Sequence, residues 1–119
     1  MTECKVGVVG VGRMGEYHAG VLSEMREAEL VGIVDSDQDR AKIISERYKT
    51  SNYKDYKELL PKVDAVIIAV PTSMHYSIGK EFIEAGIHTL LEKPCTDDLG
   101  QAEELFDIAA KKNVTLHIG

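Results

Sequence analysis

The chain has 119 residues, 44% of them hydrophobic, which is enough for one domain with a substantial core. Its formal net charge is −6 and its basic residues are dispersed, which argues against nucleic acid or an anionic membrane as a partner. The longest strongly apolar run, 65–70, is too short to span a bilayer, and the N-terminus lacks a signal-peptide pattern. Cys4 and Cys95 lack metal-ligand spacing. We therefore expect a cytoplasmic protein with reduced thiols and no metal.

The first predicted elements are a strand, a glycine-rich turn and a helix. An apolar run leads into Gly10-Val11-Gly12-Arg13-Met14-Gly15, in which the glycines follow the spacing GxGxxG. A helix is predicted over about 14–25, and a single face of it, expected to pack on a sheet, carries Met14, His18, Val21, Leu22 and Met25. The next strand, 30–35, ends on Asp35, which lies 35 − 15 = 20 residues after Gly15. This combination is typical of a dinucleotide-binding unit.

Each residue of the glycine turn has a distinct expected purpose. Gly10 allows a tight turn, Gly12 lets a pyrophosphate approach the backbone, and Gly15 lets the helix lie close to the strand. The N–H groups of Arg13 and Met14 at the helix start favour a phosphate group. The alternative is a glycine-rich turn that binds no ligand.

Helices and strands alternate through the rest of the chain. We predict helices over about 38–48, 56–60, 75–85 and 99–112, and strands over about 51–53, 65–70, 88–91 and 114–118. Asp37 is the expected N-cap of the first of these helices, which turns Ala41, Ile44 and Tyr48 inward. The last helix carries an apolar stripe of Leu99, Ala102, Phe106 and Ala109.

This alternation predicts one domain, 1–119, with a doubly wound parallel α/β sheet and helices on both faces. Six strands suggest the order 3-2-1-4-5-6, and strand 65–70, apolar throughout, is expected to be buried on both faces. In that topology Gly10, Asp35, Pro71 and Glu92 come to one crevice at the carboxyl ends of the strands.

Four segments carry a family resemblance: 8–18, 34–41, 70–75 and Glu92-Lys93-Pro94. Together they resemble the N-terminal domain of the glucose–fructose oxidoreductase / inositol dehydrogenase / rhizopine-catabolism (Gfo/Idh/MocA) family, over essentially the whole chain. The resemblance implies a two-domain NAD(P)-dependent oxidoreductase that acts on a sugar, a polyol or a related hydroxy compound. It also implies that Lys93 lies near the nicotinamide and contacts the substrate as a catalytic residue.

The remaining residues of these segments are assigned as follows, with an alternative given for His75 and for Lys93. Thr72 could contact the nicotinamide ribose, although the family often has asparagine there. His75 matches a family histidine and is placed with the cofactor-binding residues, as is Glu92; a cap or a structural hydrogen bond is the alternative for His75. Lys93 could instead be a solvated lysine paired with Glu92. His18 is expected to pack, and Cys95 to be unreactive.

The cofactor expected is NAD rather than NADP. Asp35 would accept hydrogen bonds from ribose hydroxyls, and its carboxylate would repel the additional phosphate of NADP. Arg40 is the only close cation in the sequence, and it lies a turn into the following helix.

Because Gly119 ends the last predicted strand, we expect the substrate domain to be absent from this chain, which would bind cofactor with little or no turnover. The full-length enzyme is expected to be a homo-oligomer with a small-molecule substrate. A natural short protein is the other possibility. One alternative function is a stand-alone nucleotide-sensing regulator, and another is a methyltransferase; neither needs Glu92-Lys93-Pro94.

Overall fold

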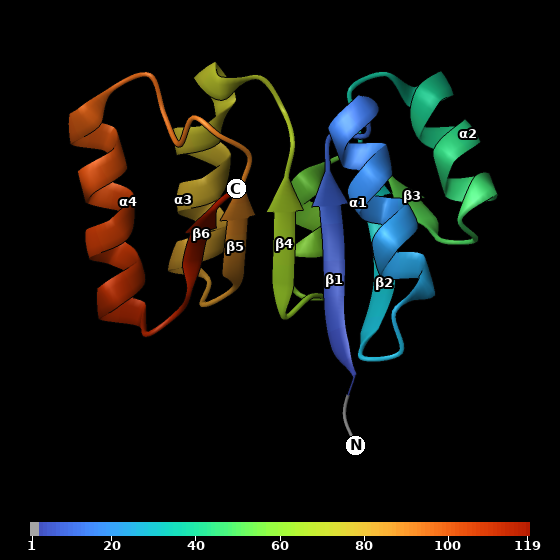
Figure 1. Ribbon diagram of the computed structural model, residues 1–119, viewed down its shortest axis with the longest axis horizontal. Coiled ribbons are helices and arrows are strands. Elements are labelled where there is room, and N and C mark those ends of the chain that lie inside the picture. The colour runs from blue at the N-terminus through green and yellow to red at the C-terminus, as the bar shows by residue number, and fades with distance from the viewer. Residues whose placement is uncertain (1–2) are drawn as a thin grey trace.

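Six parallel strands form one sheet with the order β3-β2-β1-β4-β5-β6, which confirms the predicted topology (Figure 1). The computed structural model describes residues 3–119. The strands are β1 (Cys4–Val9), β2 (Ala28–Val34), β3 (Ser51–Tyr53), β4 (Ala65–Ile68), β5 (His88–Leu91) and β6 (Leu116–Ile118). The helices are α1 (Arg13–Glu24), α2 (Gln38–Arg47), α3 (His75–Glu84) and α4 (Leu99–Lys112), with short 3₁₀ helices η1 (Tyr56–Leu59) and η2 (Thr72–Met74).

Polar residues fix the helix boundaries where the sequence places them. The Asp37 carboxylate accepts a hydrogen bond from the Arg40 N–H at 3.1 Å, which confirms the predicted cap of α2. Asp98 caps α4 in the same way. Gly86 follows α3 with a φ of +81°, a conformation that glycine adopts without strain.

Two apolar cores lie on opposite faces of the sheet. α1 and α2 pack on the face of β1 and β2, where Val8, Ile33 and Ile44 are fully buried. α3, α4 and η1 cover the other face, where Phe82, Leu59 and Leu105 are fully buried. All strand arrows point toward the edge of the sheet at which α1, α2 and α3 begin (Figure 1). The loops at this edge therefore converge, as in other doubly wound sheets.

The α1 side of β4, β5 and β6 has no covering helix among residues 3–119, and the front of these strands is open in Figure 1. Leu22 of α1, Thr115 before β6 and several strand residues line a shallow groove there: Ala65, Ile67, His88, Leu90 and His117. The expectation that strand 65–70 is buried on both faces is therefore wrong. Val66 and Ile68 are buried, but Ala65 and Ile67 are only half-buried, because α1 reaches across β4 only in part.

The predicted buried faces of two helices are only partly right: Leu22 of α1 and Ala109 of α4 are buried as expected, but other members of the two stripes are not. On α1, the residues packed against the sheet are Gly15, Ala19 and Leu22, whereas Met14, Val21 and Met25 are 49%, 42% and 44% exposed. On α4, the buried residues are Leu105 and Ala109, and the predicted stripe members Leu99 and Phe106 are exposed. The close approach of α1 to the sheet selects small residues, which a hydropathy pattern ranks below Met and Val.

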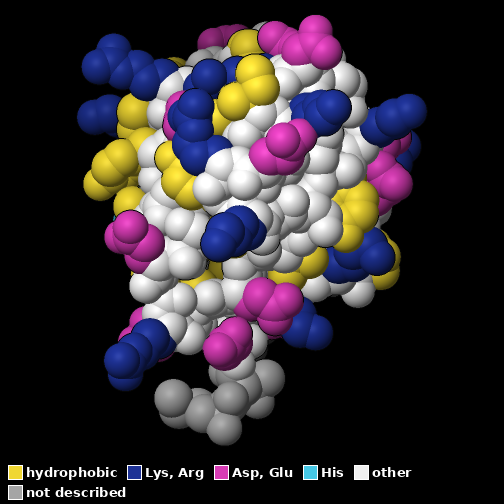
Figure 2. All heavy atoms as spheres, turned by 90° about the vertical axis from the view of Figure 1, so that its right-hand side faces the viewer, with side chains coloured by type: hydrophobic (Ala, Val, Ile, Leu, Met, Phe, Trp, Pro, Cys, Tyr) yellow, Lys and Arg dark blue, Asp and Glu magenta, His cyan; other side chains and the backbone are white. Residues whose placement is uncertain are grey.

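The surface has mixed charge on the side where α2 and β3 lie. Lys and Arg side chains alternate there with Asp and Glu, without an extended field of one sign (Figure 2). No helix of the described chain is long and apolar enough to cross a bilayer.

Candidate functional site

The glycine turn between β1 and α1 is built by close backbone contacts. Gly10 has a φ of +92°, and its N–H donates to the Val34 carbonyl at 2.7 Å. A Cβ at Gly15 would collide with the Gly10 carbonyl oxygen, so α1 can begin this near β1 only with glycine there. Gly12 differs, because a Cβ there would meet no atom within 4 Å. Its lack of a side chain is not required by packing and leaves the backbone open to a ligand.

No side chain caps the start of α1. Gly12 is the N-cap residue, and the exposed Arg13 and Met14 form the first turn. The N–H groups of a first helical turn lack helical partners and, with the aligned peptide dipoles, attract an anion. The structure thus leaves these donors free of side-chain caps at the point where the sequence predicts a pyrophosphate.

The Val11 peptide of the glycine turn is held from both sides. Its N–H donates to Asp35 Oδ2 at 2.7 Å, and its carbonyl oxygen accepts from Arg40 Nε at 2.9 Å. Asp35 Oδ1 accepts from the Asp37 N–H at 2.8 Å. Asp35 therefore lies at the end of β2 as predicted, but its carboxylate also anchors the turn.

Glu16 binds the charged side chains that α2 turns toward α1. Arg40 Nη2 donates to Glu16 Oε1 at 2.8 Å, Arg47 forms a short ion pair with Oε2, and the Tyr48 hydroxyl donates to Oε2 at 3.1 Å. Desolvation alone would raise the pKa of Glu16, but the hydrogen bonds from Arg47 and Tyr48 and the two guanidinium charges lower it. The guanidinium of Arg40 is thus bound to the glycine turn and to Glu16.

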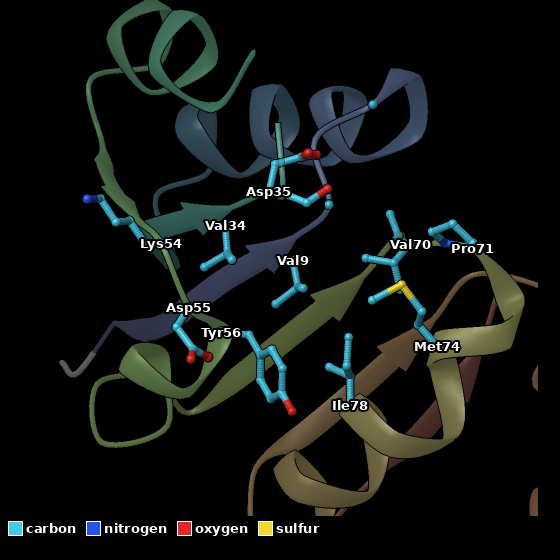
Figure 3. Close-up of a pocket in the computed structure, with 14 residues that line it drawn as sticks. Val9, Val34, Asp35, Lys54, Asp55, Tyr56, Val70, Pro71, Met74 and Ile78 are labelled. Atoms are coloured by element: carbon cyan, nitrogen blue, oxygen red, sulfur yellow. The ribbon is translucent and has the colours of Figure 1, made fainter. Parts of the chain in front are cut away.

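A cavity of about 470 Å³ opens beside the glycine turn (Figure 3). It lies at the carboxyl ends of β1, β2 and β4, and its lining is mostly apolar. The residues around it are Val9, Gly10, Gly12, Val34, Asp35, Ser36, Lys54, Asp55, Tyr56, Ala69, Val70, Pro71, Met74 and Ile78. The ring of Tyr56 and the side chain of Ile78 form one wall, with Asp35 on the opposite side (Figure 3).

Tyr56 contributes to this wall as a neutral phenol. Desolvation, followed by the neighbouring carboxylates of Glu81 and Asp55, raises the pKa of Tyr56 to about 12. Its ring also lies 6.0 Å from that of Phe82 in the core, so the wall is continuous with the packed interior.

The cavity brings together four of the predicted cofactor-binding residues, namely Gly10, Gly12, Asp35 and Pro71. The other six predicted cofactor-binding residues do not line it: Arg13, Met14, Gly15, Thr72, His75 and Glu92. Lys93 is exposed and forms no ion pair with the described residues, so the expected alternative of a Lys93–Glu92 pair is wrong. The Lys93–Pro94 peptide bond is cis.

Glu92 is bound by His18 instead. His18 Nε2 lies 2.6 Å from Glu92 Oε1, and both side chains are half-buried. The expectation that His18 serves for packing therefore misses its polar role, which joins α1 to the loop after β5.

His75 is 1% exposed, and the hydrogen-bond partners of its ring nitrogens are all backbone oxygens. Its Nδ1 lies 3.1 Å from the Pro94 carbonyl and 3.0 Å from that of Cys95, and its Nε2 lies 2.9 Å from the Val70 carbonyl. The structural hydrogen bond, rather than a helix cap, thus describes the His75 side chain. Burial raises the pKa of the Cys95 thiol, which fits the expectation of an unreactive cysteine.

The sequence prediction missed the contribution of the segment after β3. Lys54, Asp55 and Tyr56 line the cavity, and so do Met74 and Ile78 from η2 and α3. The topology that places the ends of four strands in one crevice also brings the end of β3 there. The sequence therefore held a signal for these residues, but the strand is short and weakly patterned, so its end was not used to predict the site.

Comparisons with known proteins agree with this geometry. A family model described as "Oxidoreductase family, NAD-binding Rossmann fold" matches residues 4–119. UDP-N-acetylglucosamine 3-dehydrogenase of Acidithiobacillus ferrooxidans is 34% identical over 119 residues, which are 100% of this chain and 37% of that protein. A solved structure of that dehydrogenase superposes with a TM-score of 0.94. The chain therefore spans little more than a third of the length of this relative.

Two further solved structures contain cofactors. GenD2 from gentamicin A biosynthesis, in complex with NAD, has a TM-score of 0.96 at 31% identity. The match covers 100% of this chain and 35% of the GenD2 chain. Biliverdin reductase of Synechocystis, in complex with biliverdin and NADP+, has a TM-score of 0.94 at 25% identity, over 98% of this chain and 38% of its own. The same fold thus accompanies both dinucleotides.

Proposed function

Because the chain belongs to the Gfo/Idh/MocA oxidoreductase family, whose model covers residues 4–119, we propose that it binds NAD for a dehydrogenase acting on a sugar, a polyol or a related hydroxy compound. The observation that carries this proposal is the open Gly12 backbone beside a cavity that also holds Asp35. When bound, the nicotinamide ring exchanges a hydride with the substrate. The sugar or polyol class follows the relatives, exemplified by the sugar-nucleotide dehydrogenase of A. ferrooxidans.

Three parts of the dinucleotide match three parts of the site. The pyrophosphate fits the uncapped start of α1, at Gly12 and the N–H groups of Arg13 and Met14. The adenosine ribose fits Asp35 at the end of β2, and the adenine fits the apolar cavity between Asp35 and Tyr56. The nicotinamide half would then extend toward the ends of β4 and β5, where Lys93 follows Glu92.

The preference for NAD over NADP rests on the charges around the ribose. Asp35 places a carboxylate where NADP carries its additional phosphate, and Arg40 is bound to the Val11 carbonyl and Glu16 instead of facing the cavity. Lys54 is the one basic residue that lines the cavity within the described chain, and its amino group points outward in Figure 3. The site therefore offers no cation that is already oriented toward a 2′-phosphate.

The substrate-binding part of the enzyme is proposed to lie outside these 119 residues. The chain covers 37% of the dehydrogenase from A. ferrooxidans, and the open α1 side of β4–β6 is a surface that a further module could cover. Lys93, exposed at the carboxyl edge, is proposed to contact the substrate there as the catalytic lysine.

Isothermal titration calorimetry of the chain with NAD and with NADP tests this proposal. We expect NAD to bind more tightly, and Asp35→Ala to weaken NAD binding by about tenfold or more while narrowing the difference between the two cofactors. Some of the loss will come from the glycine turn, because Asp35 also holds the Val11 N–H. NADP affinity equal to or above that of NAD in the unmodified chain would refute the role given to Asp35.

Asp39→Ala is the matched control for that experiment. Asp39 is an exposed acid in the first turn of α2, and it does not line the cavity. The Asp39 variant removes one negative charge near the site without removing a ribose ligand. It should therefore keep the affinity for NAD and the preference over NADP.

A further inference from the structure

The segment from Glu92 to Cys95 leaves β5 at the carboxyl edge of the sheet and is tied down on the α1 side. The Glu92 N–H donates to the Ile68 carbonyl at 3.1 Å, which keeps the residue in line with β5. Side chains alternate across a strand, and Leu91 is fully buried toward α3 and α4, so Glu92 turns toward α1. His18 meets it there at 2.6 Å and fixes the start of the segment.

The other end of the same segment is tied down from the opposite face of the sheet. His75, at the start of α3, lies 3.1 Å from the Pro94 carbonyl and 3.0 Å from the Cys95 carbonyl through Nδ1. Its Nε2 faces the Val70 carbonyl at the end of β4. Every partner is an acceptor, so the ring acts as a donor; a neutral ring donates from one nitrogen, and an imidazolium donates from both.

We propose that His18 and His75 are positioning residues that hold the two ends of Glu92–Cys95 from opposite faces of the sheet and thereby set Lys93 beside the nicotinamide. This inference rests on the proposed function. Lys93 itself is exposed and forms no ion pair in the described chain, so its placement depends on the backbone that carries it. His75 hydrogen-bonds the backbone of this segment directly, and His18 holds it through the side chain of its first residue, Glu92.

The arrangement also links the two halves of the cofactor site. His18 is one turn along the helix whose first residues face the pyrophosphate, and His75 follows the β4 end whose Val70 lines the cavity. A ligand that orders the glycine turn or the loop after β4 thus also orders the Glu92–Cys95 segment, through His18 on one face of the sheet and His75 on the other. Catalysis requires reacting groups to be held in register, which such contacts provide.

Nuclear magnetic resonance of the NAD-bound chain tests the proposal. We expect nuclear Overhauser contacts between the Lys93 side chain and nicotinamide protons in the unmodified chain. His18→Ala should abolish these contacts and speed the exchange of the Glu92, Lys93 and Cys95 amides by about tenfold, the effect of losing one charge-assisted hydrogen bond. Contacts between adenine and Tyr56 should persist, because that end of the site is independent of His18.

His18→Gln serves as the rescue variant, since its side-chain amide can donate to Glu92, and it should restore the nicotinamide contacts. His117→Ala is the matched control: His117 is an exposed histidine of β6 for which the described chain shows no side-chain hydrogen bond. It should change neither the contacts nor the exchange rates.

His75 is buried, so its removal could unfold the chain, and a pair of donor-keeping variants replaces the alanine test. His75→Asn keeps a donor near the Nδ1 position and should retain the Lys93 contacts, whereas His75→Gln keeps one near Nε2 and should lose them. Thermal unfolding confirms that both variants fold. Equal behaviour of two folded variants would show that the contact to Pro94 and Cys95 does not position Lys93.

The outcomes separate this inference from the function on which it rests. Failure of the unmodified chain to bind NAD would overturn the proposed function. Normal binding without a Lys93–nicotinamide contact, or a contact that survives His18→Ala, would overturn the inference alone. Loss of the adenine contacts together with the nicotinamide contacts would show that His18 is only a structural residue of α1.

Discussion

Among single residues, Glu16 shows how an acidic charge beside the proposed pyrophosphate site is neutralised by its neighbours. An acidic side chain in the first turn of α1 would repel a pyrophosphate, but Arg40, Arg47 and Tyr48 all donate to it. In the sequence, these three residues lie 24–32 positions after Glu16, and no periodicity links them to it. The fold brings them together because α1 and α2 lie side by side on the same face of the sheet.

The lowered pKa of Glu16 predicts a specific pH dependence of stability. A carboxylate whose folded-state pKa lies below its usual 4.5 stabilises the fold above that value, and the contribution is lost as pH falls through the folded-state pKa. Glu16→Gln should therefore reduce the free energy of unfolding at pH 7 and flatten its decline below about pH 4.5. Urea unfolding of both proteins across this range measures the difference.

Glu24→Gln, at the end of the same helix, is the control. Glu24 is exposed and forms no ion pair with residues 3–119. Its variant should follow the unmodified chain at every pH. If the free energy of unfolding of Glu16→Gln fell with pH in parallel with that of the unmodified chain at acidic pH, the role given to the arginine contacts would be excluded.

The histidines illustrate what residue patterns could not supply. His18 fell within an apolar stripe and was assigned to packing, although its ring binds Glu92. For His75 the sequence offered cofactor binding and a structural hydrogen bond as alternatives, and the side chain makes the latter. The hydrogen-bond partner of a polar residue on a helix can lie on a loop distant in sequence, so it is identified only from the folded structure.

At the scale of elements, the glycine turn separates structural from ligand-dependent requirements. A Cβ at Gly15 would collide with the Gly10 carbonyl, whereas a Cβ at Gly12 would meet open space. Gly15→Ala should therefore destabilise the chain by about 3 kcal/mol. Gly12→Ala should cost less than about 1 kcal/mol, as a poorer N-cap, and still abolish tight NAD binding.

Thermal unfolding measures the loss of stability in each of these two variants, and calorimetry measures their affinity for NAD. A Gly12→Ala protein that folds and binds NAD with unchanged affinity would show that the pyrophosphate does not approach this backbone. The unmodified chain provides the reference in both measurements.

The buried faces of helices were the least predictable part of the elements. α1 offered Met14, Val21 and Met25 as an apolar stripe, but Gly15 and Ala19 allow the closer contact with the sheet. Hydropathy ranks side chains by transfer energy, while packing a helix near a strand selects them by size. The exposed residues belong to the helix whose Leu22 borders the open half of the sheet, for which residues 3–119 supply no covering helix.

For the molecule as a whole, the order of the six strands was predictable and the site only partly so. Alternating strand and helix signals and the spacing from Gly15 to Asp35 specify a doubly wound sheet, because right-handed crossovers leave few other topologies. The same topology placed Gly10, Asp35 and Pro71 around one cavity. It did not reveal the wall formed by Tyr56, which depends on where a three-residue strand ends.

The two ends of the proposed site have different characters in the folded chain. The proposed adenosine end is a formed cavity of about 470 Å³ that is lined by a neutral tyrosine and the Asp35 carboxylate. The nicotinamide end is an exposed lysine on a segment held by two histidines.

A crystal structure of the chain with NAD tests the central claim most directly. We predict the pyrophosphate at Gly12 and the start of α1, the adenosine ribose on Asp35, and the adenine against Tyr56 in the cavity. A dinucleotide bound away from the carboxyl ends of β1 and β2, with this cavity left free, would contradict the account.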